Sequence, residues 1–193
     1  GSGKSTLVSA AFGMLKQATI TGQILLNGID ISTLSDSDWR KLRGTEISMI
    51  FQNPSAYLNP NRTVENHFKD LFHAHGESYD ASRVIDMLNL VHLDGGERIL
   101  QSYPFQLSGG MQQRLAIALS LILKPTIVFA DEPTSALDIL VQASVLDLLR
   151  EVTQALGATV IIVTHNIKAA ARIAHSIGVM NKGQLVEVGS TEE

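Results

Sequence analysis

Residues 126–133 have the sequence TIVFADEP, a short apolar run that ends in an Asp-Glu pair. A second apolar run, ATVIIV at 158–163, follows after a helical pattern that covers 139–156. Short β-branched runs without polar alternation are typical of strands buried on both faces of a parallel sheet. A strand, a helix and a second strand joined by a crossover predict an α/β fold with a parallel sheet.

The flanking segments supply further elements. Asn27-Gly28 lies between two short apolar runs, and because both residues accept positive φ, an antiparallel hairpin is expected over 23–31. We also expect a helix over 4–17, a short helix capped by Ser35, and a strand at 46–51. Other helices are expected after the capping residues Thr63, Asp80 and Ser108, a helix end at Gly157, and a closing hairpin at 176–188.

The length and composition suit one domain. The chain has 193 residues, of which 45% are hydrophobic, and carries a net charge of −4. With no Cys, disulfide scaffolds and thiolate metal sites are excluded, and the mildly acidic balance argues against nucleic acid as a partner. Lys124 and Pro125 interrupt the longest apolar stretch, so no membrane span is predicted.

The first residues indicate phosphate binding. Within residues 1–6, GSGKST, the first five match the last five positions of G-x-x-x-x-G-K-[ST], so the motif is expected to be cut within its loop. In such a loop the backbone N–H groups surround phosphates, the Lys reaches the β- and γ-phosphates, and the hydroxyl ligates Mg²⁺. The predicted ATP-binding residues are Gly1, Ser2, Gly3, Lys4, Ser5 and Thr6. The alternative is a flexible Gly/Ser turn before a helix.

The carboxylates after 126–130 complete a nucleotide site. A parallel strand places them at its carboxyl end, where α/β sheets bind ligands. Asp131 would hold Mg²⁺ and Glu132 would polarise an attacking water. The alternative is an Asp-Glu-Pro turn, but beside Lys4 and Ser5 the pair predicts a P-loop NTPase.

Residues 107–114, LSGGMQQR, provide a second helix start suited to an anion. Here the sequence resembles the ATP-binding cassette (ABC) family, whose signature segment closes on ATP held by the P-loop of another subunit. The signature residues are Leu107, Ser108, Gly109, Gly110 and Gln112.

The resemblance implies further roles, in family order along the chain. Gln52 matches the Q-loop glutamine, which senses Mg²⁺ and the attacking water, and His165 matches the switch histidine that contacts the γ-phosphate. The D-loop would be Ser135, Ala136, Leu137 and Asp138. The implied cofactors are ATP and Mg²⁺, with Ser5, Gln52 and Asp131 at the metal.

The resemblance also implies an architecture: a RecA-like core with a parallel sheet, a small antiparallel β-subdomain and a helical insert. We expect one ABC ATPase domain over 1–193, with 1–60 and 119–193 as the core and 61–118 as the helical subdomain.

Finer features point to one branch of the family. IFQNPSAYLNP (50–60) and SYPFQLSGGMQQR (102–114) are similar to the peptide and nickel importers, although Asn53 and Asn166 replace the acidic residues often found there. Implied partners are a second cassette, membrane permease subunits and, indirectly, a solute-binding protein, at the cytoplasmic face of the membrane. The alternatives are half of a ribosome-associated or DNA-repair ABC ATPase, and a cassette that binds ATP without hydrolysing it.

Overall fold

The computed structural model describes residues 2–15 and 18–191. At its centre is a parallel sheet in the order β3 (Ile47–Ile50), β4 (Ile127–Asp131) and β5 (Thr159–Val163). Ile50 lies opposite Ala130, and Asp131 lies opposite Val163, so the three strands end at the same edge. The α/β fold with a parallel sheet is therefore confirmed.

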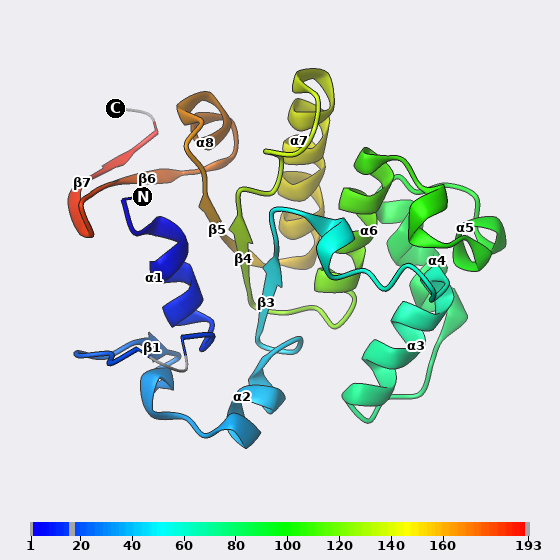
Figure 1. Ribbon diagram of the computed structural model, residues 1–193, viewed down its shortest axis with the longest axis horizontal. Coiled ribbons are helices and arrows are strands. Elements are labelled where there is room, and N and C mark those ends of the chain that lie inside the picture. Colours follow the sequence, from blue (N-terminus) through cyan, green and yellow to red (C-terminus); the bar gives the residue numbers. More distant parts are fainter. Residues whose placement is uncertain (1, 16–17, 192–193) are drawn as a thin grey trace.

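One face of the sheet is covered by N-terminal elements (Figure 1). They are α1 (Lys4–Ala11), the hairpin of β1 (Leu25–Leu26) and β2 (Ile29–Asp30), the short 3-10 turn η1 (Ile31–Thr33), and α2 (Asp36–Leu42). Alternate residues of β3 and β4 point to this face. One of them is Phe129 of β4, which forms a buried cluster with Phe12 and Trp39. Asn27 and Gly28 have φ of 49° and 81°, as the predicted hairpin turn requires.

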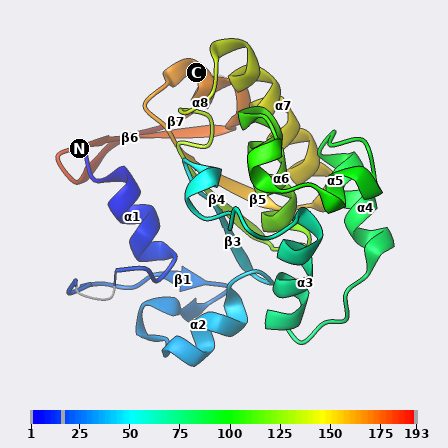
Figure 2. The ribbon, with the colours of Figure 1, turned by 45° about the vertical axis from the view of Figure 1, so that its right-hand side comes forward.

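The other face packs against a larger helical layer, seen from a second side in Figure 2. Val128 and Ala130 point to this face and join one buried cluster with residues of these helices. The helices are α3 (Val64–Ala74), α4 (Ala81–Leu90), α5 (Glu97–Gln101), α6 (Gly109–Leu121), α7 (Ile139–Leu156) and α8 (Ile167–Ile173), with 3-10 turns η2 (Pro54–Ala56) and η3 (Pro104–Gln106). Thr63, Asp80 and Ser108 each accept a hydrogen bond from the third residue beyond, so the predicted N-caps are confirmed.

The last two strands form a separate antiparallel hairpin, β6 (Ser176–Asn181) and β7 (Gln184–Ser190). Lys182 and Gly183 provide its turn with positive φ. The amide of Gly183 donates to the carbonyl of Ser2 at 3.0 Å, so this hairpin lies beside the start of α1.

Three expectations need correction. The helix predicted over 4–17 ends at Ala11, because Gly13 takes the left-handed conformation with φ of 69°; residues 16 and 17 lie outside the described part. β5 is not buried on both faces: Thr159 and Ile161, which point to the same face of the sheet, are exposed, and Ile161 is 43% exposed. The short helix α5 was not predicted from the sequence.

The division into a core and a helical subdomain at 61–118 stays a prediction. The described helices α3–α5 fall inside this range, but the buried cluster that contains them is continuous with the sheet through Ile50 and Val128.

Candidate nucleotide-binding site

Three of the predicted site residues follow the carboxyl ends of the three parallel strands. Gln52 comes after β3, Glu132 after β4 and His165 after β5, each within two residues of the strand end. Because the strands are in parallel register, this single edge collects side chains that are far apart in the sequence. Gln52 is exposed there.

The segment predicted to bind phosphate begins α1, beside the same edge. Gly3 has φ of 90° and is the N-cap of the helix, a conformation that favours glycine. Lys4 Nζ donates to Ser2 Oγ at 3.0 Å, and Thr6 is exposed on the first turn of α1. Gly1 lies outside the described residues. The helix N-terminus, the glycine and the ammonium group together form a suitable environment for an anion.

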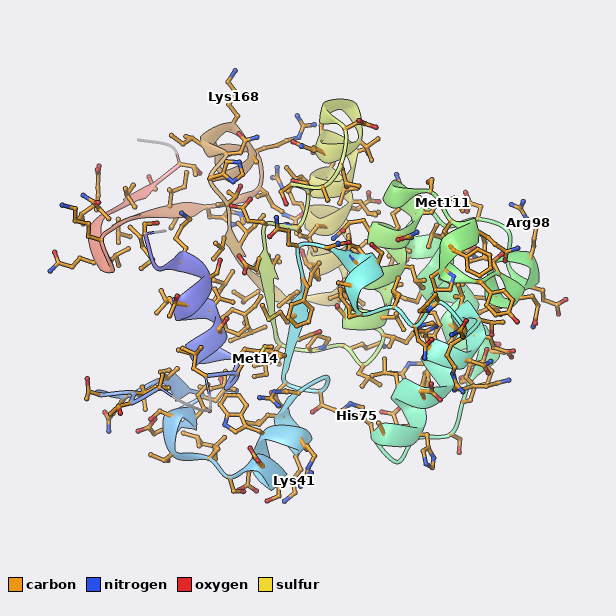
Figure 3. All side chains as sticks on the ribbon, viewed as in Figure 1. Met14, Lys41, His75, Arg98, Met111 and Lys168 are labelled. Carbon is orange, nitrogen blue, oxygen red and sulfur yellow. The ribbon has the colours of Figure 1, made fainter. Side chains whose placement is uncertain are left out.

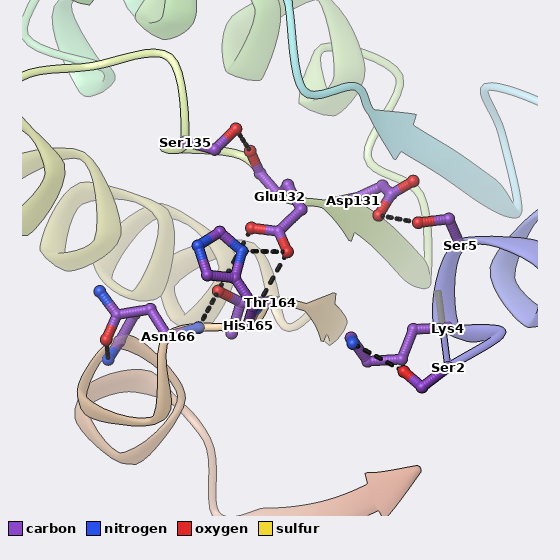
Figure 4. Close-up of polar contacts among 10 residues, drawn as sticks. Ser2, Lys4, Ser5, Asp131, Glu132, Ser135, Thr164, His165 and Asn166 are labelled. Carbon is purple, nitrogen blue, oxygen red and sulfur yellow. Dashed lines mark hydrogen bonds and ion pairs between the residues drawn. The ribbon is translucent and has the colours of Figure 1, made fainter. Parts of the chain in front are cut away.

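Ser5 and Asp131 meet across the two motifs. Ser5 Oγ donates to Asp131 Oδ1 at 3.0 Å, joining the first turn of α1 to the end of β4 (Figure 4). Both residues are predicted to lie at Mg²⁺, and their oxygens are close together in the structure.

Glu132 and His165 are also in contact. Glu132 Oε1 lies 2.7 Å from His165 Nδ1 and accepts a second hydrogen bond from the backbone N–H of His165 at 2.9 Å. The glutamate side chain is 16% exposed and that of His165 is 75% exposed. Glu132 has φ of 48°, and such backbone strain in a non-glycine residue is typical of functional sites.

Thr164 belongs to this site although the sequence analysis gave it no role. Its hydroxyl donates to Glu132 Oε2 at 3.5 Å and accepts from the amide of Asn166 at 3.0 Å. A hydroxyl residue directly before the predicted switch histidine was the available sequence signal. The side chain of Asn166 in turn caps α8 by accepting from the amide of Ala169.

The predicted D-loop turns back on Glu132. Both the amide and the hydroxyl of Ser135 donate to the carbonyl of Glu132, at 3.2 and 3.1 Å. Ala136 and Leu137 follow, and Asp138 is the N-cap residue of α7. The turn is therefore held against the backbone of Glu132.

The predicted signature segment lies on the other side of the sheet from α1 (Figures 1 and 2). Ser108 caps α6 by accepting from the amide of Met111, and Leu107 is buried. Gln112 Nε2 donates to the carbonyls of Pro104 and Leu107, which fixes the approach to the helix.

The signature glycines allow close packing within the chain. A Cβ on Gly109 would lie 3.6 Å from the side chain of Leu137, and one on Gly110 would lie 3.1 Å from that of Val141. The start of α6 is therefore packed against the D-loop and the start of α7, whereas α1 packs against the opposite face of the sheet.

Comparison with known proteins agrees with this arrangement. Residues 1–135 match the family model described as ABC transporter. The chain is 43% identical over 196 residues to the dipeptide transport ATP-binding protein DppD of Caldanaerobacter subterraneus, covering 98% of this chain and 60% of that protein. It is 39% identical over 198 residues to the oligopeptide transport ATP-binding protein OppD of Lactococcus lactis, covering 100% of this chain and 59% of that protein. The chain thus spans about 60% of the length of these curated relatives.

Solved structures give the same result. The fold is similar to a dimeric ATP-binding cassette in a post-hydrolysis state bound to ADP and Pi, with a TM-score of 0.81 and 30% identity, over 98% of this chain and 81% of that one. It is also similar to cbiO1 of Clostridium perfringens, part of the cbiONQ ABC transporter complex, with a TM-score of 0.82 and 30% identity, over 99% of this chain and 74% of that one. The family model matches residues 1–135, which is more than half of the chain. The chain therefore belongs to the ABC transporter family and is an ABC ATPase domain with the P-loop NTPase fold.

Proposed function

We propose that this chain is the nucleotide-binding part of an ATP-binding subunit that powers peptide import. The observation that carries the hydrolytic part is the contact of Glu132 with His165 beside the pair of Ser5 and Asp131. The transport part is supported by the relatives, whose names describe ATP-binding proteins of dipeptide and oligopeptide transport. A nickel or other metal complex is the alternative cargo.

ATP would bind with its phosphates at the start of α1. Lys4 would contact the β- and γ-phosphates, and the N–H groups of the first turn would donate to phosphate oxygens. The site also fits Mg²⁺, because Ser5 and Asp131 present a hydroxyl and a carboxylate oxygen at hydrogen-bond distance, and Mg²⁺ is usually bound by few protein oxygens together with phosphates and water. When bound, the ion would neutralise charge on the phosphates.

Glu132 would act on the attacking water. Its carboxylate can accept a proton from a water that attacks the γ-phosphorus, while the bond from this phosphorus to the bridging oxygen of ADP breaks. This carboxylate contacts His165 Nδ1 at 2.7 Å. Binding of ATP would draw His165 toward the γ-phosphate and leave Glu132 free to orient the water.

A second cassette would complete each site. Ser108 at the start of α6 is suited to a phosphate, but it belongs to the helical layer opposite α1. The two anion-binding ends of one chain therefore cannot hold the same nucleotide, and two chains arranged head to tail would place the signature of one against the P-loop of the other. Differential affinity of ATP for the closed dimer would then drive closure.

The permease would be contacted near Gln52. A cavity of about 330 Å³ opens beside this segment, between the N-terminal elements and the helical layer. It is lined by Phe51, Tyr57, Leu71 and Leu119 among others. An apolar segment of a membrane partner seated there would sense movement of the helices relative to the nucleotide. The subunit would thus be peripheral, at the cytoplasmic face of the membrane. Among the described residues, no helix is both long and apolar enough to cross a bilayer.

The test is reconstitution of the full-length protein with its permease subunits in liposomes. We expect ATP hydrolysis that depends on Glu132 and is stimulated by a loaded peptide-binding protein, with peptide accumulating inside. If a metal complex alone stimulates ATP hydrolysis, the cargo is a metal complex and not a peptide. Hydrolysis that is stimulated by ribosomes or DNA and never by permeases would overturn the transport role.

A further inference from the structure

Arg43 donates hydrogen bonds to the C-terminal end of α1, the helix that carries the predicted phosphate-binding residues. Its Nε donates to the carbonyl of Phe12 at 3.2 Å, and its Nη2 donates to the same carbonyl at 3.0 Å and to that of Gly13 at 2.9 Å. The last carbonyls of a helix lack partners within the helix, and a cation there interacts favourably with the helix dipole. The planar, forked guanidinium can serve two carbonyls at once.

Two aromatic rings fix this guanidinium. Its Cζ lies 5.3 Å from the ring centroid of Phe12 and 5.1 Å from that of Trp39. Trp39 is buried in α2, so the arginine joins the end of α1 to the end of α2. Burial lowers the pKa of Arg43 from its ordinary value, and Asp36 partly counters this effect. A charge kept in such a partly desolvated position needs all of these partners.

The next residue connects the same segment to the helical layer. Gly44 has φ of 91°, and a Cβ placed on it would lie 2.7 Å from His75 Nε2. His75 is the C-cap residue of α3, and Figure 3 shows it between α3 and the segment that joins α2 to β3. Arg43 and Gly44 therefore contact the phosphate-binding helix on one side and the end of α3 on the other.

We propose that Arg43 is a positioning residue for ATP hydrolysis, which fixes the orientation of α1 and, through Gly44, joins that helix to the helical layer at His75. The proposal rests on the proposed ATPase function. Eight residues of helix span about 12 Å, so a tilt of about 5° at the C-terminal end of α1 moves Lys4 and Ser5 by about 1 Å. A misplacement of this size can cost about 100-fold in rate.

The expected kinetic effect falls on kcat. A loosened α1 can still bind ATP in the ground state, because a lysine side chain has several rotatable bonds with which to reach a shifted phosphate. In the transition state, Ser5 must keep its position beside Asp131 while Glu132 aligns the attacking water. We therefore expect Arg43→Met to lower kcat about 10- to 100-fold with a change in KM for ATP of less than about threefold. Arg43→Lys should lie between this variant and the wild type, because one ammonium cannot reproduce the planar fork.

Lys69 provides a control cation in the full-length protein. Its Nζ lies 5.1 Å from the ring centroid of Tyr79 and pairs with Glu65 at 2.9 Å, so Lys69→Met removes a cation, a ring contact and an ion pair from α3, which carries none of the predicted site residues. Rates are divided by the fraction of protein that binds a fluorescent ATP analogue, which separates misfolding from slow turnover. The expected result is a loss of kcat for Arg43→Met and a change of less than about twofold for Lys69→Met.

Two results would overturn the positioning role. One is equal kcat losses in Arg43→Met and Lys69→Met, which would show general destabilisation. The other is an unchanged kcat in Arg43→Met. If the wild-type protein itself fails to hydrolyse ATP while binding it, the proposed function fails instead, so the two failures are distinguishable.

Discussion

Glu132 Oε1 lies 2.7 Å from Nδ1 of His165, so the two side chains expected to act on ATP contact each other. The carboxylate also accepts from the backbone N–H of His165 at 2.9 Å. A base occupied by two donors is poorly placed to accept a proton from water. If Glu132 acts as the proposed base, we expect this contact to break before hydrolysis.

Glu132→Gln is expected to lower ATP turnover at least about 100-fold, because the amide accepts a proton poorly but keeps the size of the side chain. ATP binding should persist, and the ATP-bound dimer should accumulate. Phosphate release and sedimentation in the presence of ATP measure the two effects. Turnover at the wild-type rate would remove Glu132 from its role as the base.

His165→Ala and Asn166→Ala separate a chemical role from a structural one. Asn166 caps α8 through the amide of Ala169, and its loss should cost about 1 kcal/mol of folding free energy with little effect on turnover. His165→Ala removes a side chain that is 75% exposed, so it should leave stability unchanged and lower turnover strongly. Urea unfolding and ATPase assays on both variants test this contrast, which a reversed pattern would refute.

Ser108→Arg is expected to block ATP-driven dimerisation while the monomer still binds ATP, because a large cation would occupy the start of α6. Ser108 also caps that helix, so the variant loses a cap as well. Thr63→Arg is the matched control, since Thr63 caps α3 through an equivalent bond to the amide of Asn66. Sedimentation with ATP should show dimers for Thr63→Arg alone; dimers for both variants would contradict the role assigned to the signature.

Gly13→Ala is expected to lower the free energy of unfolding by more than Gly76→Ala does. Both glycines have φ near 70°, but a Cβ on Gly13 would lie 2.3 Å from Trp39, whereas nothing lies within 4 Å of one on Gly76. We expect a loss of about 2–5 kcal/mol for Gly13→Ala and of about 1–2 kcal/mol for Gly76→Ala. Equal losses, measured by urea unfolding, would show that backbone strain alone accounts for the effect.

The ion pair of Asp147 with Arg172 gives a pH-dependent contribution to stability. Arg172 Nε donates to Asp147 Oδ1 at 2.6 Å, and this hydrogen bond lowers the pKa of Asp147 below its ordinary 3.8. A lowered pKa means that the contribution is complete above about pH 4 and is lost as the pH falls through the folded-state value. Asp147→Asn should therefore lower the urea midpoint at pH 7, by an amount that shrinks as the pH falls below the ordinary pKa of 3.8. A difference that stays constant with pH would argue against this pair as its cause.

The sequence predicted most of the fold where local chemistry decides the structure. Asn27-Gly28 accepts the positive φ of a hairpin, and Thr63 and Ser108 present cap oxygens, so these elements could be located without tertiary information. The end of α1 could not be located in this way, because Gly13 stops the helix in a position where only glycine fits against Trp39. That fit depends on a residue in a different helix.

The candidate site was predictable in its members but not in its contacts. Ordered motifs pointed to Ser5, Asp131, Glu132 and His165, yet the pairing of Glu132 with His165 depends on the register between β4 and β5. Thr164 and Arg43 were missed, because their roles come from hydrogen bonds to Glu132 and to the carbonyl of Phe12. A lone threonine or arginine has no sequence pattern that reveals such partners.

The shared edge of β3, β4 and β5 also determines where the chain tolerates length changes. Gln52, Glu132 and His165 each follow a strand end within two residues, so inserting one residue in these short intervals would turn the side chain away from the nucleotide. Insertions in the helical layer between β3 and β4, or at the exposed turn after α7, leave all three intervals intact. Variation in length among related chains should therefore concentrate in those helices and turns, while the spacing from strand to functional side chain stays fixed.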